Sequence, residues 1–219
     1  MSDLTLVSLN IGRGQTRHWR GKTVETAIEK HPVFGEVALT EAGLAGDEQK
    51  DTKNHGGPDK AVLAIPAGNY ARFGVFWHWG ALGENLTLPD ALNETVVRLG
   101  DRLRVGDALL EVTQPRSPCW KLDELGSAFT GRKGFLQRYA ASGRVGIYLR
   151  VLEAAPLRVG QPLEHLPGEQ AAPTIHDLFL AKHAGGRTPE QREIIEQALS
   201  HPALSQAWRD ELTRLLSQT

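Results

Sequence analysis

The 219-residue chain has little sulfur, because it contains one cysteine, Cys119, and one methionine. A single cysteine cannot form an internal disulfide, and it excludes structural zinc sites built from several cysteines. A reduced thiol is typical of the cytoplasm, which we expect to be the location of the protein. The N-terminal stretch also lacks the basic and apolar regions of a secretory signal peptide, which agrees with this expectation.

The sequence also lacks long apolar runs and an excess of charge of one sign. No run approaches the roughly 20 apolar residues of a transmembrane helix, so no membrane partner is expected. The formal net charge of -1 at pH 7 gives no reason to expect a nucleic-acid polymer as partner. The hydrophobic fraction of 40% and the charged fraction of 23% are typical of a globular protein. The length fits one domain with an appendage or two small domains.

Common cofactor and phosphate motifs are missing as well. Gly12-Arg13-Gly14 follows a predicted strand, but it lacks the third glycine and the helix of a dinucleotide-binding fingerprint. We interpret it as a turn. The chain contains neither a P-loop nor the His-Glu-x-x-His sequence of zinc proteases. The chemistry must therefore be sought in other residues.

Short alternating runs between glycine-containing turns predict a mostly β structure in the first part of the chain. Residues 95–115 are interpreted as three strands separated by two Gly-Asp pairs, which favour tight reversals. Many short strands at close spacing favour a β barrel or a β sandwich. Further strands are predicted within residues 4–11, 37–40, 60–66 and, as a pair, 143–166.

The pattern changes after a linker rich in proline, glycine and alanine. Thr174 is expected to cap a first helix, and Thr188 with Gln191 matches the capping-box start of a second helix. A third segment has apolar residues near helical spacing. We predict a three-helix domain over residues 174–219, docked on a β domain over residues 1–166.

Cys119 follows a predicted strand in the stretch QPRSPCWKL. A cysteine without an assigned role is often a buried side chain that behaves as an apolar residue. Pro115 and Pro118 cannot extend a central strand, so the segment is expected to leave the sheet as a rigid loop. Arg116 and Lys121 bring positive charge close in sequence and favour a thiolate. A fixed thiolate suits either a nucleophile or a ligand for a soft metal, although no cysteine-protease signature surrounds it.

Two glycine-containing stretches are candidate pocket loops. KNHGGPDKAV contains His55, which can donate to an anion or polarise a carbonyl, and Asp59. A turn with surface charges is an equal alternative for this stretch. GALGENLTL adds Glu84 and Asn85 before a predicted strand, and a simple glycine turn is again the alternative.

A basic stretch near the N-terminus contains Lys22 and Lys30 among polar residues. One interpretation is a solvated protein face. The other is a basic loop that holds a phosphate group. The residues alone leave both interpretations open.

Several ordered stretches resemble the MOSC domain, a family named for the C-terminal domain of molybdenum cofactor sulfurases. They are GLAGDEQKDTKNHGGPDKAVLAIP, LGENLT, LGDRLRVGDALLEVTQPRSPCWKL and SGRVGIYLRV. The opening GKTVETAIEKHPV and the helical tail resemble the bacterial YiiM-type members of the family. The resemblance implies an α+β fold, a mostly β barrel followed by a small helical domain. It also implies the molybdenum cofactor (molybdopterin), and no pyridoxal phosphate is expected.

The resemblance further implies roles for individual residues. The cysteine that matches Cys119 is the protein ligand to molybdenum in the family, and His55 is a candidate proton donor. Lys22 and Lys30 are candidate phosphate contacts. The candidate cofactor-binding residues are Lys22, Lys30, His55, Asp59, Glu84, Asn85, Arg116 and Cys119.

The expected function is therefore that of a molybdenum-dependent reductase. Proteins of this type reduce N-hydroxylated small molecules, such as the toxic base analogue hydroxylaminopurine, to amines. A separate redox protein would supply the electrons. The alternatives are a non-catalytic carrier of the cofactor or of sulfur, and a transferase with a persulfide on Cys119. The sequence does not indicate whether the protein forms oligomers.

Overall fold

The computed structural model describes residues 4–50 and 56–218. The strands are β1 (Ser8–Ile11), β2 (Gln15–Trp19), β3 (Lys22–Thr26), β4 (His31–Pro32), β5 (Leu39–Thr40), β6 (Gly43–Leu44), β7 (Val62–Pro66), β8 (Leu86–Leu88), β9 (Arg102–Val105), β10 (Ala108–Pro115), β11 (Ile147–Glu153) and β12 (Leu163–Leu166). The helices are α1 (Gly68–Phe73), α2 (Trp120–Thr130), α3 (Phe135–Ala141), α4 (Ile175–His183), α5 (Pro189–Ser200) and α6 (Gln206–Ser217), with short 3-10 turns η1 (Pro58–Lys60) and η2 (Asp90–Leu92).

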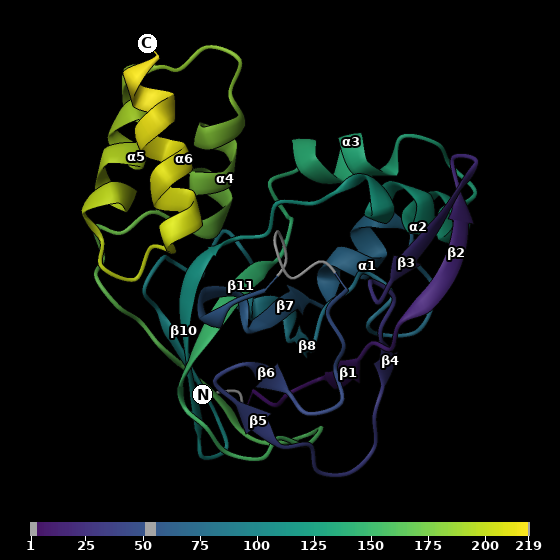
Figure 1. Cartoon of the computed structure of the whole chain (residues 1–219). Coiled ribbons are helices and arrows are strands. Elements are labelled where there is room, and N and C mark those ends of the chain that lie inside the picture. The colour runs from purple at the N-terminus through teal and green to yellow at the C-terminus, as the bar shows by residue number, and fades with distance from the viewer. Residues whose placement is uncertain (1–3, 51–55, 219) are drawn as a thin grey trace.

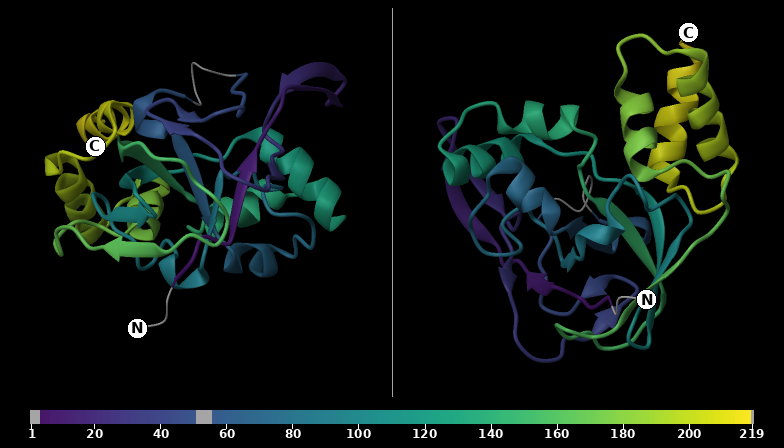
Figure 2. Two further views of the ribbon diagram at one scale, coloured as in Figure 1. Left: turned by 90° about the horizontal axis from the view of Figure 1, so that it is seen from below. Right: turned by 180° about the vertical axis from the view of Figure 1, so that it is seen from behind.

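A mixed eight-stranded sheet forms the centre of the protein, in the order β12-β9-β10-β11-β7-β8-β1-β4. β7 and β8 are parallel, and the other neighbouring strands are antiparallel. The hairpins β2–β3 and β5–β6 lie outside this sheet. In Figure 1 and in the rear view of Figure 2, helices α4–α6 and helices α2–α3 lie beyond the same end of the central strands, with α4–α6 near β10 and α2–α3 near β2 and β3.

The predicted barrel is wrong, because the sheet does not close, although the α+β class is confirmed. The edge strands are β12 and β4. The chain before β1 approaches the chain before β12 through an isolated bridge between Thr5 and Pro162 and a few backbone hydrogen bonds. A barrel requires a continuous staggered ladder at this point. The edge strand β4 has two residues and pairs with β1, so it does not supply that ladder.

Residues 95–115 form two strands, β9 and β10, and not the predicted three. The segment before β9 is a turn, because the carboxylate of Asp101 accepts hydrogen bonds from the backbone N–H groups of Arg98 at 2.8 Å and Gly168 at 2.7 Å. Gly106 has a φ of 57° at the reversal between β9 and β10, as a tight hairpin requires. The two strands predicted within residues 143–166 are confirmed as β11 and β12.

Helix α2 begins at Trp120, directly after Cys119, and the sequence interpretation missed it together with α3. Gly126 lies inside α2, where glycine is normally unfavourable. A Cβ at this position would lie 2.2 Å from the ring of Phe135 on α3, so close packing of the two helices requires the glycine. Most of the basic stretch, predicted as a face or a loop, forms part of the β2–β3 hairpin, and Lys30 lies between β3 and β4.

The three predicted C-terminal helices are confirmed as α4, α5 and α6. Thr174 caps α4, and Thr188 with Gln191 forms the complete capping box of α5. Phe179 of α4 and Trp208 of α6 are buried in an apolar cluster that also includes residues of α1, α2 and α3. The predicted boundary between residues 1–166 and 174–219 stays a prediction. Within the described part of the chain, no helix is long and apolar enough to cross a membrane.

Candidate functional site

Cys119 lies where the chain passes from the sheet into the helical layer. β10 includes Pro115, which pairs with Ile147 although a proline was not expected to extend a central strand, and the chain then leaves the sheet as predicted. Cys119 is the N-cap residue of α2 with φ -109° and ψ 169°, and its side chain makes no capping hydrogen bond. The residue is half-buried. Cys119 is therefore held at the start of an 11-residue helix, and it lines two cavities.

We call one of these cavities the Cys119 pocket. It is lined by Thr26, Ala27, Ile28, Lys30, Gln49, Lys50, Leu63, Gly83, Arg116, Cys119, Lys121 and Tyr148. Four of these side chains are basic and none is acidic. A further cavity, which Cys119 does not line, adjoins this pocket, because both share Lys30 and Tyr148. Asn85 lines the adjoining cavity. The basic lining favours an anionic ligand beside the thiol.

Arg116 ties the strand end before Cys119 to the loop before β8. It is 5% exposed, and its Nη1 donates to the carbonyl oxygen of Leu82 at 2.7 Å. The neighbouring Gly83 has a φ of 93°, and a Cβ there would lie 2.9 Å from the carbonyl oxygen of Ile28. Only glycine therefore allows this loop to approach the pocket wall so closely.

Lys30 forms a buried ion pair on another wall of the pocket. Its Nζ lies 2.5 and 2.7 Å from the two carboxylate oxygens of Asp47. Asp47 also accepts hydrogen bonds from the backbone N–H of Gly12 at 2.7 Å and from Nδ2 of Asn85 at 2.9 Å. Burial lowers the pKa of Lys30, and the carboxylate of Asp47 offsets part of that effect. The pair fixes the position of Lys30 and connects it to Asn85.

Glu84 lies behind the pocket and is fully buried. Its Oε1 accepts hydrogen bonds from the Tyr70 hydroxyl at 2.7 Å, the Gly80 N–H at 2.8 Å and the Thr87 hydroxyl at 2.9 Å. Its Oε2 has no hydrogen-bond partner among the described residues. Burial raises the pKa of Glu84, and the hydrogen bonds to its carboxylate offset only part of this rise.

The Glu84→Gln variant is expected to change how stability depends on pH. Because the native pKa of Glu84 is raised above the unfolded value near 4.5, this residue stabilises the wild type fully below pH 4.5. That contribution is lost as the pH rises through the native pKa. Glutamine does not titrate and keeps an oxygen for the three donors. The free energy of unfolding of the variant minus that of wild type, measured with urea, should therefore be higher at pH 7.5 than at pH 4.5.

The comparison isolates Glu84 because the second buried carboxyl with a raised pKa, Glu94, is present in both proteins and cancels. A difference between variant and wild type that is equal at the two pH values would contradict the raised pKa of Glu84.

The structure brings together only some of the predicted site residues. Cys119, Arg116 and Lys30 line one pocket, Asn85 lines the adjoining cavity, and Glu84 supports the loop behind them. The remaining predicted residues are not seen to line these two cavities. The functional roles of all the predicted site residues stay predictions.

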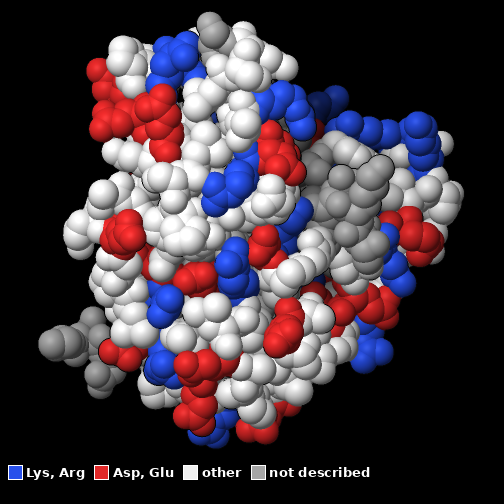
Figure 3. Space-filling model, turned by 60° about the vertical axis from the view of Figure 1, so that its left-hand side comes forward, with Lys and Arg blue, Asp and Glu red and all other residues white. Residues whose placement is uncertain are grey.

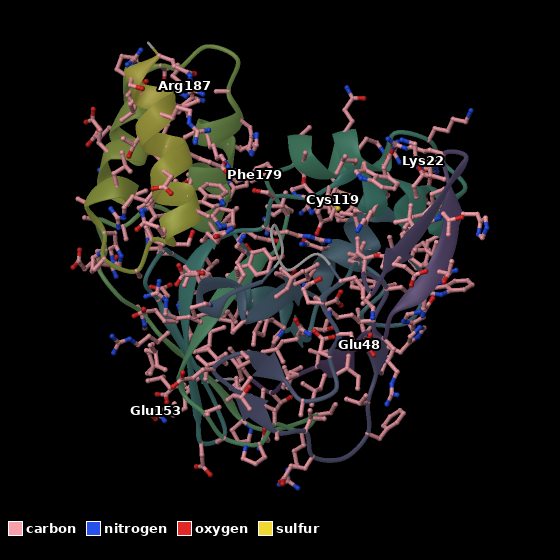
Figure 4. All side chains as sticks on the ribbon, viewed as in Figure 1. Lys22, Glu48, Cys119, Glu153, Phe179 and Arg187 are labelled. Carbon is pink, nitrogen blue, oxygen red and sulfur yellow. The ribbon has the colours of Figure 1, made fainter. Side chains whose placement is uncertain are left out.

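Lys22 and Asp59 do not line either cavity. Lys22 is exposed at the start of β3, and Figure 4 shows it well apart from Cys119. Asp59 is 2.8 Å from Arg150 Nη2 and accepts from the backbone N–H of Gln206 at 3.2 Å, so it connects η1 to the start of α6. His55 lies outside the described residues.

Tyr148 is a pocket residue that the sequence interpretation missed. It lines the Cys119 pocket and the adjoining cavity, and it is 7% exposed. Burial raises its pKa, the positive charge of Arg116 opposes this, and Cys119 adds to the rise. Its hydroxyl therefore keeps its proton at neutral pH. The alternation of side-chain directions along β11 was the available signal, since it could have shown toward which face of the sheet Tyr148 points.

The charges on the molecular surface are mixed. In Figure 3, acidic and basic residues are interspersed over the visible face. Among the described residues that line the Cys119 pocket, by contrast, the charged ones are all basic. The concentration of positive charge is thus a property of the pocket and not of this face as a whole.

Comparisons with known proteins are consistent with this arrangement. A family model described as MOSC domain matches residues 51–164. The chain is 36% identical over 213 residues to YflK of Bacillus subtilis, described as uncharacterized, with 94% of this chain and 91% of YflK covered. It is 34% identical over 202 residues to the protein YiiM of Escherichia coli, with 84% and 81% covered.

Two further similarities concern a named activity and a solved structure. A protein named reductase from Gibberella moniliformis is 32% identical over 154 residues, which cover 67% of this chain and 26% of that protein. The crystal structure of YiiM from Geobacillus stearothermophilus superposes with a TM-score of 0.72 at 30% identity, and 97% of this chain and 99% of that chain are covered. Sequence and fold thus agree over nearly the full length.

Proposed function

Since the chain belongs to the MOSC domain family, we propose that it is an oxidoreductase that binds the molybdenum cofactor and reduces N-hydroxylated small molecules. Hydroxylaminopurine is the proposed model substrate, and adenine is the product. The similarity to a protein named reductase supports an enzyme of this class. A separate redox protein would deliver the electrons.

One observation carries the proposal: a half-buried thiol and several basic side chains line the same pocket. The cofactor combines a metal bound by two sulfur atoms with a phosphate group at the other end of the pterin. A cysteine thiolate is a suitable soft ligand for such a metal. Lys50, Arg116 and Lys121 supply cations for the phosphate, and the glycine backbone at Gly83 allows close approach. The chemistry of the residues that line the pocket therefore suits both ends of the cofactor.

The chain would contribute binding, orientation and protons. The bound cofactor would supply the two electrons that break the N–O bond, so that with two protons the hydroxylamine gives an amine and water. Cys119 would hold the metal end, while the Arg116–Leu82 hydrogen bond keeps the pocket wall fixed. The protonated hydroxyl of Tyr148, buried in the same pocket, is the proposed proton donor to the leaving oxygen.

The proposal is tested with protein purified from a host that makes the molybdenum cofactor. We expect about one molybdenum and one pterin per chain, measured by elemental analysis and by pterin fluorescence. With an artificial electron donor, this protein should convert hydroxylaminopurine to adenine, followed by chromatography. Bound cofactor without conversion would favour the carrier. A persulfide on Cys119, detected by alkylation and mass spectrometry in protein without molybdenum, would favour the sulfur transferase.

A further inference from the structure

Glu29, His31 and His78 form a compact group on the wall of the protein next to Lys30. Each can offer one ligand atom, a carboxylate oxygen or a ring nitrogen, and these atoms lie within 4.8 Å of one another. None of the three lines the Cys119 pocket. Glu29 and His78 are half-buried and His31 is exposed, so an ion could reach the group from solvent.

The orientation of His78 is fixed by its surroundings. Its Nδ1 lies 2.8 Å from the carbonyl oxygen of Trp79, and a carbonyl only accepts, so Nδ1 must carry a proton and donate it. In the neutral ring, the lone pair is then on Nε2. This is the arrangement that outer hydrogen bonds impose on metal-binding histidines. The Nε2 atom faces Oε1 of Glu29 at 3.3 Å.

Two lone pairs facing each other at this distance repel unless a positive charge lies between them. A proton on Nε2 is one solution, and a metal ion is the other. The rings of His31 and His78 are stacked with centroids 4.4 Å apart, so a cation bound beside one ring can also reach the other. A shared cation would satisfy both rings and the carboxylate without protonating either ring.

Glu29 is also held in place by a second partner. Its Oε2 accepts a hydrogen bond from Nη2 of Arg17 on β2, which leaves Oε1 directed at His78. The backbone is equally fixed, because Lys30 N–H donates to the Gly80 carbonyl at 3.1 Å and His31 pairs with Ile11. Three potential ligands are therefore presented by two segments that are already joined.

We propose that Glu29, His31 and His78 bind a divalent transition-metal ion of the zinc class. Two imidazoles and one carboxylate are a typical ligand set for zinc, with water in the remaining position. With metal–ligand distances near 2.0–2.2 Å, neighbouring ligand atoms lie about 3.4 Å apart, so shifts of about 1 Å in the side chains close the site. The ion would join the segment around Lys30 to the loop before Gly83, and Lys30 and Gly83 both line the Cys119 pocket.

The test is a titration of the metal-free, full-length chain with Zn²⁺ in competition with a chromophoric chelator. We expect one tightly bound Zn²⁺ per chain. His31→Gln should weaken binding at least about tenfold, since even changes to outer partners of metal ligands cost roughly 10–100-fold. His31 is exposed, so this variant should fold normally. His78→Gln should have the same effect.

Two control variants locate the ion. His18→Gln removes an exposed histidine of the neighbouring strand β2 and should bind Zn²⁺ as wild type does. Cys119→Ser should also bind normally, because the thiol is not part of the proposed site. Wild-type affinity in both His31→Gln and His78→Gln, or loss of Zn²⁺ in Cys119→Ser, would overturn the proposal. These outcomes do not depend on whether the chain reduces hydroxylamines.

Discussion

The Cys119→Ser variant is expected to bind the molybdenum cofactor more than about 100-fold more weakly than wild type and to lose hydroxylamine reduction with it. Changes to partners that only orient metal ligands already cost roughly 10–100-fold in affinity, so loss of the ligand itself should cost more. A serine hydroxyl is a harder and less acidic group than a thiol and does not replace a soft ligand. Molybdenum content of the purified variant and adenine formation are the two measurements.

The matched control is Ser117→Ala, two residues earlier in the same loop. It removes one hydroxyl and leaves the sulfur and the fold of the loop in place. We expect its molybdenum content to equal that of wild type. If Cys119→Ser keeps its molybdenum, the thiolate is not the ligand. If both variants lose it equally, the loop and not the sulfur is responsible.

The parts of this fold that depend on neighbouring residues were predictable from the sequence. Thr188 and Gln191 satisfy the first N–H groups of α5 within one turn, so the start of that helix follows from four residues. Pro115 is the last residue of β10 and still pairs with Ile147, contrary to the expectation for a proline, but the chain leaves the sheet before Pro118, so Cys119 lies beyond the strand as predicted. Each of these features depends on chemistry within a few positions.

The parts that depend on distant residues were not predictable in this way. The prediction of a barrel was wrong because closure of the sheet depends on how residues 4–6 meet residues 160–163, more than 150 positions apart. α2 was missed because Gly126 argues against a helix until Phe135 is seen to need the space. The resemblance supplied the expected role of Cys119 as a metal ligand, but it could not show that Asp59 contacts Arg150 and lines neither cavity.

In the candidate site, too, the features that depend on nearby residues were predictable and those that depend on distant residues were not. Arg116 and Cys119 are neighbours in sequence, and their joint presence in one pocket follows from a short loop. Lys30 reaches that pocket only because Asp47, on another loop, compensates its buried charge. A sequence pattern shows a lysine in a polar stretch, and only the tertiary structure distinguishes a solvated lysine such as Lys22 from a buried one.

The Lys30→Met variant should therefore lower the free energy of unfolding by about 3 kcal/mol. Removing one partner of a buried ion pair leaves the other charge uncompensated, which typically costs about 3–5 kcal/mol. We expect the lower end, because Asp47 keeps its hydrogen bonds from Gly12 and Asn85. Urea denaturation of wild type and variant at neutral pH measures the difference.

Two further proteins separate the effect of charge from the loss of a side chain. In the double variant Lys30→Met/Asp47→Asn no buried charge remains unpaired, so part of the lost stability should return, and the double-mutant cycle should show coupling between the two positions. Lys50→Met breaks the exposed pair with Glu48 and should cost much less, because solvent screens that pair. Equal losses for Lys30→Met and Lys50→Met would mean that burial does not strengthen the Lys30–Asp47 pair, and that Lys30 reaches the Cys119 pocket for another reason.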